Sequence, residues 1–377
     1  MNFKRFAIVA LFTFTFTPLL LAQNGELLPS PPPTFPLTPV PADSIVIDDF
    51  FWNGQFQFVK QAFPQLKATP WTITEKDIKK TQKQIAKWPQ LCKEIHITGH
   101  IPSSKKHPLY SAVSIAQSNA LMGLITGEGK YLDLTERAYY NSICNYQKSN
   151  QPKIAQLAAQ AVMEWPRYAM TTSGNHIYIN MYMRGEAHIK TDVLDLVLMN
   201  TTSTPWFYQS LFQFTFLNEQ RHVVLHLRLP EWLDNHPLLD YKMEEIRQKV
   251  IVKLNGNRLK TKTQNGYLIV EAELSDDDVL ILEMQTPIRR VYDNSGSSTV
   301  ALQKGPLLYS FLNFPAEGRI RTQDLIHSAF DKHRHTNVLS GTSYDAQGNP
   351  TETYQAEPYV YNRDSTRSRL FVPLDQQ

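Results

Sequence analysis

Cysteine is scarce in this chain, because Cys92 and Cys144 are the two present among 377 residues. Two cysteines carry no spacing signature, so one disulfide bond and two free thiols both remain open. The sequence has no CxxC or HExxH motif, and its cysteines and histidines are not clustered at the spacing of a zinc site. The sequence therefore lacks the motifs that are typical of small zinc-binding domains and of disulfide-rich domains.

A large excess of one charge is also missing. Lys and Arg number 38 against 35 Asp and Glu, which gives a formal net charge of +3. Nucleic-acid binding needs a concentrated basic face, whereas the basic residues here are scattered along the chain. We therefore expect no nucleic acid among the partners of this protein.

Long apolar runs are absent beyond the first 22 residues. Lys4 and Arg5 precede an apolar run from Phe6 to Leu21, and Ala22 is a small residue after which signal peptidase can cut. A run of about 16 residues is marginal for crossing roughly 30 Å of hydrocarbon. The sequence therefore predicts a cleaved signal peptide at 1–22, with an uncleaved anchor as the alternative. We expect a secreted or periplasmic protein with no membrane contact after cleavage.

The rest of the chain contains enough apolar sequence to fold. Hydrophobic residues make up 42% and charged residues 19%, as is usual for globular domains. Residues 23–43 are rich in proline and predict an extended spacer. After it we expect a helical region at 44–174, a β-sandwich at 175–310, and a C-terminal β region at 311–377 that completes the sandwich.

The region 44–174 begins with a predicted strand at 44–52 and continues as helices. Thr74 is a suitable N-cap for a helix from Glu75 to Trp88, because Asp77 follows it three residues later. Further helices are predicted at 110–124, 131–146 and 154–165, with a helix stop at 126–129. Helices joined by short turns predict paired helices that pack against one another.

From residue 175 the apolar period changes to that of strands. Predicted strands, separated by turns such as Asn255-Gly256 and Asn265-Gly266, lie at 176–183, 189–198, 211–216, 223–229, 250–254, 267–272, 279–283 and 300–302. Short strands at this spacing are typical of an antiparallel sandwich. Residues 320–350 are polar and predicted to be irregular, and a last pair of strands is predicted within 357–374.

Several segments of the sequence resemble motifs of glycoside hydrolase family 127, and they occur in the same order as in that family. The segment 130–141 resembles a helix of that family with a Y-x-D-x-x-E-R-x-x-Y-N pattern. The strand HIYINMYM resembles its LYVNLYI strand. The strings LRLPEW, VKLNG, NGYLI, ALQKGPLLY and AEPYVYNR resemble further motifs of its β region, and they lie at 227–232, 252–256, 265–269, 301–309 and 356–363. Together the strings extend over about 235 residues.

This resemblance implies an (α/α) barrel followed by antiparallel β-sandwich domains, so the fold class is multidomain α+β with a partial helical barrel. It implies hydrolysis of terminal β-L-arabinofuranosyl units, so carbohydrate is the expected partner. It also implies a cysteine thiolate nucleophile held by zinc with two further cysteines and a glutamate, and a separate glutamate as general acid and base.

The catalytic positions of that family are not found in this chain. The segment 98–103 resembles the family's TGGIGS turn, but Lys105, Lys106 and His107 follow it where the acidic stretch is expected. Residues 53–175 are also too few for a complete barrel. We therefore expect a shortened member without the family's general acid.

The family's nucleophile and zinc ligands are missing in the same way. Its ETC motif aligns with 108–110 or 110–112, where neither glutamate nor cysteine is present, and Cys144 is the single cysteine where a CC pair is expected. A chain with two cysteines cannot supply three to zinc. We expect no zinc, no other cofactor, and impaired catalysis.

Three residues are candidates for the site. Glu136 matches a family position near the sugar and is the catalytic candidate. Glu164 and Trp165 are the substrate-binding candidates, because a carboxylate beside an indole face suits a sugar. The structural alternatives are polar contacts on a helix for Glu136 and core packing for Trp165.

Four other residues are compatible with a site, but a structural interpretation is preferred for each. Cys144 would need a lowered pKa to act as a nucleophile. His333 and His335 have i,i+2 spacing that can hold a metal, yet they lie in a polar, charged segment. Trp206 is interpreted as sandwich packing.

Three functional hypotheses follow. The first is an exported, impaired family 127-like protein that binds or acts on L-arabinofuranosyl-containing glycans. The second is an active glycosidase that uses a different carboxylate pair including Glu136. The third is a non-catalytic carbohydrate-binding or scaffold protein. A homo-oligomer is an additional possibility, because an incomplete barrel exposes apolar helix faces.

Overall fold

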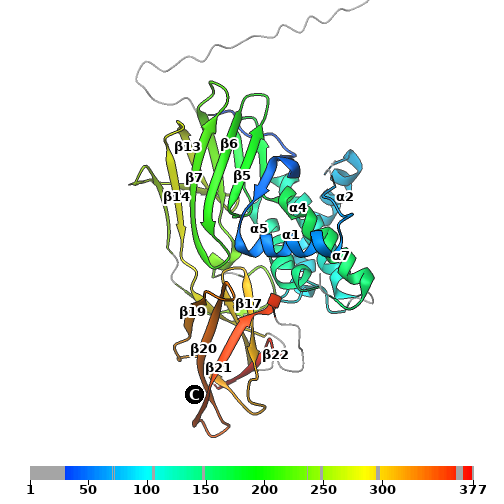
Figure 1. Ribbon diagram of the computed structural model, residues 1–377, viewed down its shortest axis with the longest axis vertical. Coiled ribbons are helices and arrows are strands. Elements are labelled where there is room, and N and C mark those ends of the chain that lie inside the picture. The colour runs from blue at the N-terminus through cyan, green and yellow to red at the C-terminus, as the bar shows by residue number, and fades with distance from the viewer. Residues whose placement is uncertain are drawn as a thin grey trace, which may run out of the picture. The chain divides into compact units, whose positions relative to one another are not determined.

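The computed structural model describes residues 30–69, 71, 73–103, 107–146, 149–235, 237–246, 249–293, 298–361 and 368–375 (Figure 1). The predicted signal peptide at 1–22 lies outside these residues, as do Lys105 and Lys106. The described residues from 33 onward form one compact unit. Among the described residues, no helix combines the length and the apolar character that a membrane crossing requires.

The helical elements confirm most of the helix predictions, with shifted ends. They are α1 (Phe50–Ala62), α2 (Glu75–Ile85), α3 (Trp88–Glu94), α4 (Pro108–Thr126), α5 (Gly129–Ala138), α6 (Cys144–Tyr146) and α7 (Pro152–Glu164), with a π-helical turn at Tyr139–Ile143 between α5 and α6. The predicted capping box is present, since the Thr74 side chain accepts from Asp77 N and Asp77 accepts from Thr74 N.

The turn between α4 and α5 brings these two helices together. Gly127 has a φ of 67°, a left-handed conformation that glycine adopts without a steric penalty, and its N–H donates to Gly123 O. The chain then enters α5 at Gly129. This turn confirms the predicted helix stop and directs α5 toward the strands.

Two sheets make up the sandwich. In the first, the strand order is β1 (Thr38–Pro39), β3 (Met170–Ser173), β4 (His176–Ile179), β8 (His222–Arg228), β13 (Tyr267–Glu273) and β12 (Lys262–Gln264). In the second it is β11 (Asn257–Arg258), β10 (Val250–Leu254), β14 (Val279–Met284), β7 (Phe207–Phe216), β6 (Asp195–Ser203), β5 (Gly185–Lys190) and β2 (Ile45–Ile47). Figure 1 shows β5, β6, β7 and β14 side by side, with α4 and α5 next to this part of the chain.

Burial along the strands distinguishes the two sheets. Buried and more exposed residues alternate along β6 and β7, which is the pattern of a sheet with one covered face. All residues of β4, and all but the first of β8, are buried. The first sheet is therefore covered on both faces at β4 and β8, and α5 contributes to this cover through its ion pairs with Arg228 of β8.

The third sheet is formed by the C-terminal strands. Its order is β18 (Ile320–Arg321), β23 (Val372–Asp375), β16 (Thr299–Lys304), β17 (Leu307–Leu312), β21 (Pro350–Pro358), β20 (Thr336–Tyr344) and β19 (His327–Asp331). β15 (Ile288–Tyr292) pairs with β16 and with β9 (Lys242–Met243), and β22 (Ser368–Arg369) pairs with β17. Most pairings are antiparallel, but β4–β8 and β18–β23 are parallel.

Three element predictions were wrong. The strand predicted at 44–52 ends at Ile47, because Asp49 accepts a hydrogen bond from Trp52 N and starts α1. The strand predicted at 189–198 is a hairpin of β5 and β6, closed at Thr191, whose side chain accepts from Val193 N and Leu194 N. Residues 320–350 contain β19 and β20, since pairing of β19 with β20 and of β20 with β21 stabilises strands that their polar sequence does not favour.

Asn141 connects the helices to the third sheet. Its Nδ2 donates to Pro306 O at 2.8 Å, and its Oδ1 accepts from Leu308 N at 2.9 Å. Both partners belong to the GPLLY string that resembles family 127. Two of the strings that carry the resemblance are therefore in direct contact, although they are more than 160 residues apart.

Candidate functional site

A buried network of charged side chains joins α5 to β8. Asp133 and Glu136 are three residues apart and so lie on the same face of α5. Arg228 is fully buried and pairs with both of them, through Nη1 to Asp133 Oδ1 and through Nη2 to Glu136 Oε1 at 2.9 Å. Arg228 also donates from Nε to Asn180 O. Glu136, the catalytic candidate, is therefore an ion-pair partner at a helix–sheet contact.

A second pair continues this network. Arg137 donates from Nη2 to Glu231 Oε2 at 2.7 Å and from Nη1 to Ile97 O at 3.0 Å. The backbone N–H of Glu231 donates to Asp133 Oδ1 at 3.0 Å, and Glu231 Oε1 accepts from Leu238 N at 2.9 Å. The two pairs thus share Asp133 and form one connected group.

The network contains more carboxyl groups than guanidinium groups. Asp133, Glu136 and Glu231 contribute three carboxyl groups, whereas Arg137 and Arg228 contribute two guanidinium groups, and all five side chains are buried. Burial raises the pKa of Asp133 to about 8, with Arg228 opposing the shift and the neighbouring Glu231 adding to it. We infer that Asp133 carries a proton at neutral pH.

This proton makes stability depend on pH. The folded-state pKa of Asp133 lies above its ordinary value of 3.8, so the folded chain binds more protons than the unfolded chain between pH 3.8 and about 8. The contribution of Asp133 to stability is therefore fully present below pH 3.8 and is lost as the pH rises through 8. Asp49, whose pKa burial raises to about 7, acts in the same direction.

The variant Asp133→Asn is expected to make the pH dependence of stability shallower by up to about 1.4 kcal/mol per pH unit. Asparagine keeps the Oδ1 acceptor but does not titrate. The free energy of unfolding, measured by urea denaturation from pH 5 to 8, tests this. Asp195→Asn is the control, because hydrogen bonding to Lys190 lowers the pKa of the half-buried Asp195 and its titration falls below this range. An unchanged slope in Asp133→Asn would contradict a proton on Asp133.

A cavity of about 330 Å³ adjoins the network, and we call it the α5 cavity. Its charged residues are Lys130 and Asp133 from α5 and Glu231 and Asp234 from the segment after β8. Its apolar lining includes Leu229, Pro230, Leu233, Leu238 and Val250. The volume and the mixture of apolar walls with a few polar groups fit a small ligand such as one sugar unit.

The sequence predictions identified this region only in part. Glu136 was selected, but it is not among the residues that line the α5 cavity. Asp133 and Glu231 line it and were not selected, although both stand inside the strings that carry the resemblance, at 130–141 and 227–232. The available signal was an acidic residue three positions after a basic one in each string, Asp133 after Lys130 and Glu231 after Arg228.

Glu164 and Trp165 lie at the end of α7, in a different part of the helical region. Glu164 is 7% exposed; it accepts from Thr69 and pairs with Arg167. Trp165 is 1% exposed, and its ring stacks on Trp52 with centroids 4.4 Å apart. Its Nε1 donates to Met183 Sδ. The indole therefore belongs to the aromatic core, and both of its faces are within that core.

The two cysteines and His333 lie apart from one another. Cys92 and Cys144 are free, buried thiols in separate core clusters. Burial raises the pKa of Cys92 to about 12 and that of Cys144 further. His333 lies in the exposed turn between β19 and β20. Among the described residues, no group of three or more His, Cys, Asp and Glu side chains is arranged to hold a metal ion.

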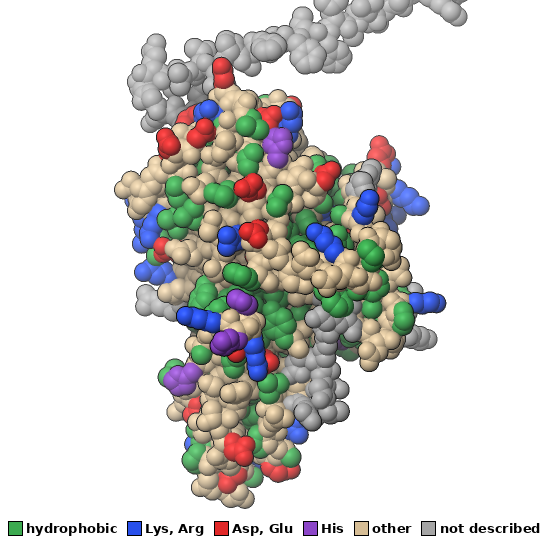
Figure 2. All heavy atoms as spheres, in the orientation of Figure 1, with side chains coloured by type: hydrophobic (Ala, Val, Ile, Leu, Met, Phe, Trp, Pro, Cys, Tyr) green, Lys and Arg blue, Asp and Glu red, His purple; other side chains and the backbone are tan. Residues whose placement is uncertain are grey.

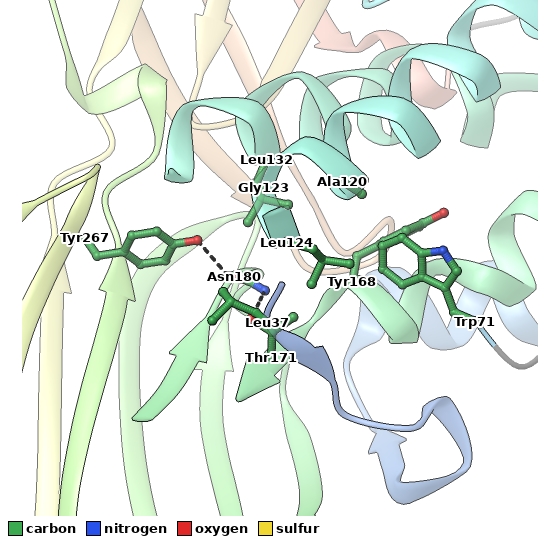
Figure 3. Close-up of a pocket in the computed structure, with 10 residues that line it drawn as sticks. All are labelled: Leu37, Trp71, Ala120, Gly123, Leu124, Leu132, Tyr168, Thr171, Asn180 and Tyr267. Atoms are coloured by element: carbon green, nitrogen blue, oxygen red, sulfur yellow. Dashed lines mark hydrogen bonds between the residues drawn. The ribbon is translucent and has the colours of Figure 1, made fainter. Parts of the chain in front are cut away.

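A second, much smaller cavity lies between α4 and the first sheet (Figure 3). Two hydrogen bonds lie in the wall of this cavity. Tyr267 Oη donates to Asn180 Oδ1 at 2.9 Å, and Asn180 Nδ2 donates to Thr171 Oγ1 at 3.2 Å. Its volume of about 10 Å³ holds at most one water molecule. It therefore has no room for a sugar.

A family model matches the β region of the chain. Residues 176–286 match the model described as β-L-arabinofuranosidase, GH127 middle domain. This match starts at β4 and ends after β14, so it covers most of the two sandwich sheets. It confirms the family resemblance on which the sequence predictions rested. No curated protein matches the chain.

Solved structures share the fold. A structure described as a GH127 β-arabinofuranosidase has a TM-score of 0.69 and 18% identity, and the match covers 78% of this chain and 56% of that one. A β-L-arabinofuranosidase from Geobacillus stearothermophilus T6 has a TM-score of 0.66 and 15% identity, covering 86% and 60%. A structure described as a glycoside hydrolase has a TM-score of 0.61 and 17% identity, covering 74% and 54%.

These structures confirm a mixed fold of helices and extensive antiparallel sheets. The chain spans 54–60% of the length of the three structures. The partial (α/α) barrel remains a prediction. At these identities the likeness concerns the fold alone.

Proposed function

We propose that this chain recognises glycans with L-arabinofuranosyl units and is impaired in their hydrolysis, because residues 176–286 match the GH127 middle domain and the fold is similar to that of β-L-arabinofuranosidases. The family match at 176–286 is the observation that carries this proposal. The proposed place of recognition is the α5 cavity, because it joins that matched region to the helix that resembles the family.

The number and the burial of the two cysteines are the reason for proposing impaired hydrolysis. The zinc that the resemblance implies requires three cysteines and a glutamate, and the chain has two cysteines. Both are buried, and burial raises the pKa of each. A nucleophilic or zinc-binding cysteine needs a lowered pKa, not a raised one. The residues present therefore do not fit that zinc site.

Recognition without hydrolysis is supported by the composition of the α5 cavity. The Lys130 ammonium forms an ion pair with Glu128 and lies 5.1 Å from the centre of the Tyr131 ring. Protonated Asp133 can donate one hydrogen bond, and the carboxylate of Glu231 can accept. Sugar hydroxyls require both donors and acceptors of this kind.

Incubation of the full chain with an aryl β-L-arabinofuranoside, zinc and a thiol reductant is expected to give no turnover above buffer, in the parent and in Glu136→Gln alike. Release of the aryl group is measured by absorbance, with circular dichroism to show that both samples are folded. In the same preparations, calorimetric titration with an arabinan oligosaccharide is expected to show binding. Turnover that disappears in Glu136→Gln would contradict the proposal of impaired hydrolysis. Absence of binding would contradict the proposed recognition of L-arabinofuranosyl glycans.

A second candidate function is a glycosidase that uses carboxyl groups. Asp133, which burial holds protonated to about pH 8, and Glu231, paired with Arg137, both line the α5 cavity. An acid and a carboxylate held in different protonation states are the pair that ordinary glycoside hydrolysis uses. Turnover that is lost in Asp133→Asn and in Glu231→Gln, but kept in Glu136→Gln, would favour this function.

Export is also proposed, on the sequence of residues 1–22 alone. A secreted or periplasmic location suits a protein that meets polymeric glycans. A homo-oligomer likewise remains a proposal.

A further inference from the structure

A separate cavity of about 370 Å³ lies where the start of α1 meets the turns β6–β7 and β19–β20, and we call it the aromatic cavity. Its lining includes the start of α1 at Asp49 and Phe50, the segment 202–207, and Phe330, Lys332 and His335. It shares no residue with the α5 cavity. Three segments far apart in the sequence thus form its walls.

Its walls expose aromatic rings. Phe50 is 68% exposed, Phe207 51% and Phe330 37%, and the rings of Phe207 and Phe330 lie 6.0 Å apart. His335 stacks on Phe50 with centroids 4.9 Å apart and an interplanar angle of 5°. Large exposed aromatic side chains gathered at one cavity mark a binding surface. Flat ring faces of this kind pack against the C–H faces of sugars.

Two buried polar atoms at this cavity lack partners. Asp49 and Trp206 both line it, and each is 4% exposed. Asp49 Oδ1 caps α1, but Asp49 Oδ2 and Trp206 Nε1 have no hydrogen-bond partner within the described part of the chain. Buried polar groups almost always have a partner. A ligand hydroxyl can supply the missing acceptor for the indole N–H and a donor for the carboxyl oxygen.

The charge around the aromatic cavity is mainly positive. Arg184 and Lys332 line it, and Lys304 Nζ lies 5.2 Å from the centre of the Phe207 ring. On the acidic side, Asp49 lines the cavity, where burial raises its pKa to about 7, and Asp48 pairs with Arg184 at 3.8 Å, an exposed and weak pair. Figure 2 shows basic and histidine side chains gathered beside hydrophobic ones, between the strands β5–β7 and the strands β20–β21.

We propose that the aromatic cavity binds an acidic sugar, a hexuronate unit of a glycan, with its C–H face against the phenylalanine rings and its carboxylate toward Arg184 and Lys332. This inference rests on the proposed recognition of glycans and adds a second site with a different sugar. Aromatic rings alone would accept any sugar, so the basic side chains set the preference for a carboxylate.

The test is calorimetric titration of the full chain with trigalacturonate and with a neutral galactotriose of the same length. The expected result is binding of the acidic trisaccharide at least tenfold tighter than the neutral one. Phe207→Ala is expected to weaken binding of the acidic trisaccharide at least tenfold. Lys332→Gln is expected to reduce the preference for the acidic trisaccharide and its dependence on salt.

Leu217→Ala is the matched control, because Leu217 is 56% exposed and follows the opposite end of β7 from Phe207. It is expected to leave the affinity unchanged. Asp133→Asn in the α5 cavity is also expected to leave it unchanged, so failure of the α5 site and failure of this site give different results. No binding of trigalacturonate, equal binding of both trisaccharides, or full affinity in folded Phe207→Ala would each overturn the proposal.

Discussion

Replacement of Arg228 by methionine is expected to destabilise the folded chain by about 3–5 kcal/mol. Arg228 is fully buried and holds two carboxyl groups of α5 together with Asn180 O of the first sheet. Its loss leaves Glu136 buried without its cation, and removal of one partner from a buried pair costs much more than the pair itself contributes. The expected outcome is a markedly lower urea midpoint with an unchanged denaturant dependence.

Arg334→Met is the control for this experiment. Arg334 is also ion-paired, to Glu357, but its side chain is 58% exposed. Exposed pairs contribute about 0–1 kcal/mol, so this variant should unfold close to the parent. The double variant Arg228→Met with Glu136→Gln should recover part of the lost stability, because it removes the buried carboxylate that Arg228 no longer pairs with. Equal stability of Arg228→Met and the parent would show that this network does not hold α5 on β8.

Replacement of Trp165 by alanine is expected to cost about 3–5 kcal/mol of stability. The side chain is 1% exposed, stacks on Trp52 and lies 4.5 Å from the ring of Tyr139, centroid to centroid. Its removal leaves a cavity that the surrounding rings cannot fill without moving. Trp165→Phe should cost less, since it keeps a ring against Trp52.

This pair of variants decides the role predicted for Trp165. A sugar platform would lose glycan affinity on replacement while the melting temperature stayed the same. A core residue would lose stability, and Trp165→Phe would keep glycan affinity. Trp71→Ala serves for comparison, because Trp71 is half-buried at the edge of the same cluster, against Tyr168. Its effect on the melting temperature should be clearly smaller than that of Trp165→Ala.

Much of the fold was predictable because it depends on local sequence. Thr74 with Asp77 defines a helix start, Gly127 a helix end, and the alternation along β7 a half-buried strand. The errors occurred where one local signal competed with another, or where a strand depends on its neighbours in a sheet. The apolar run 45–52 was predicted as one strand, yet the Asp49 side chain caps a helix inside it. The polar strands β19 and β20 are stabilised by pairing, β19 with β20 and β20 with β21, and not by the propensity of their own residues.

The candidate sites were less accessible to sequence. Composition and motif spacing alone established that two cysteines cannot form a three-cysteine zinc site, and the order of the strings established the family resemblance. Which acidic residues line a cavity was decided only by the tertiary structure, since α5 and the segment after β8 are about 95 residues apart. The aromatic cavity likewise exists only because the start of α1, the β6–β7 turn and the β19–β20 turn meet. Local propensity acts over a few residues, whereas burial, pKa and cavity shape depend on neighbours that the chain brings together from afar.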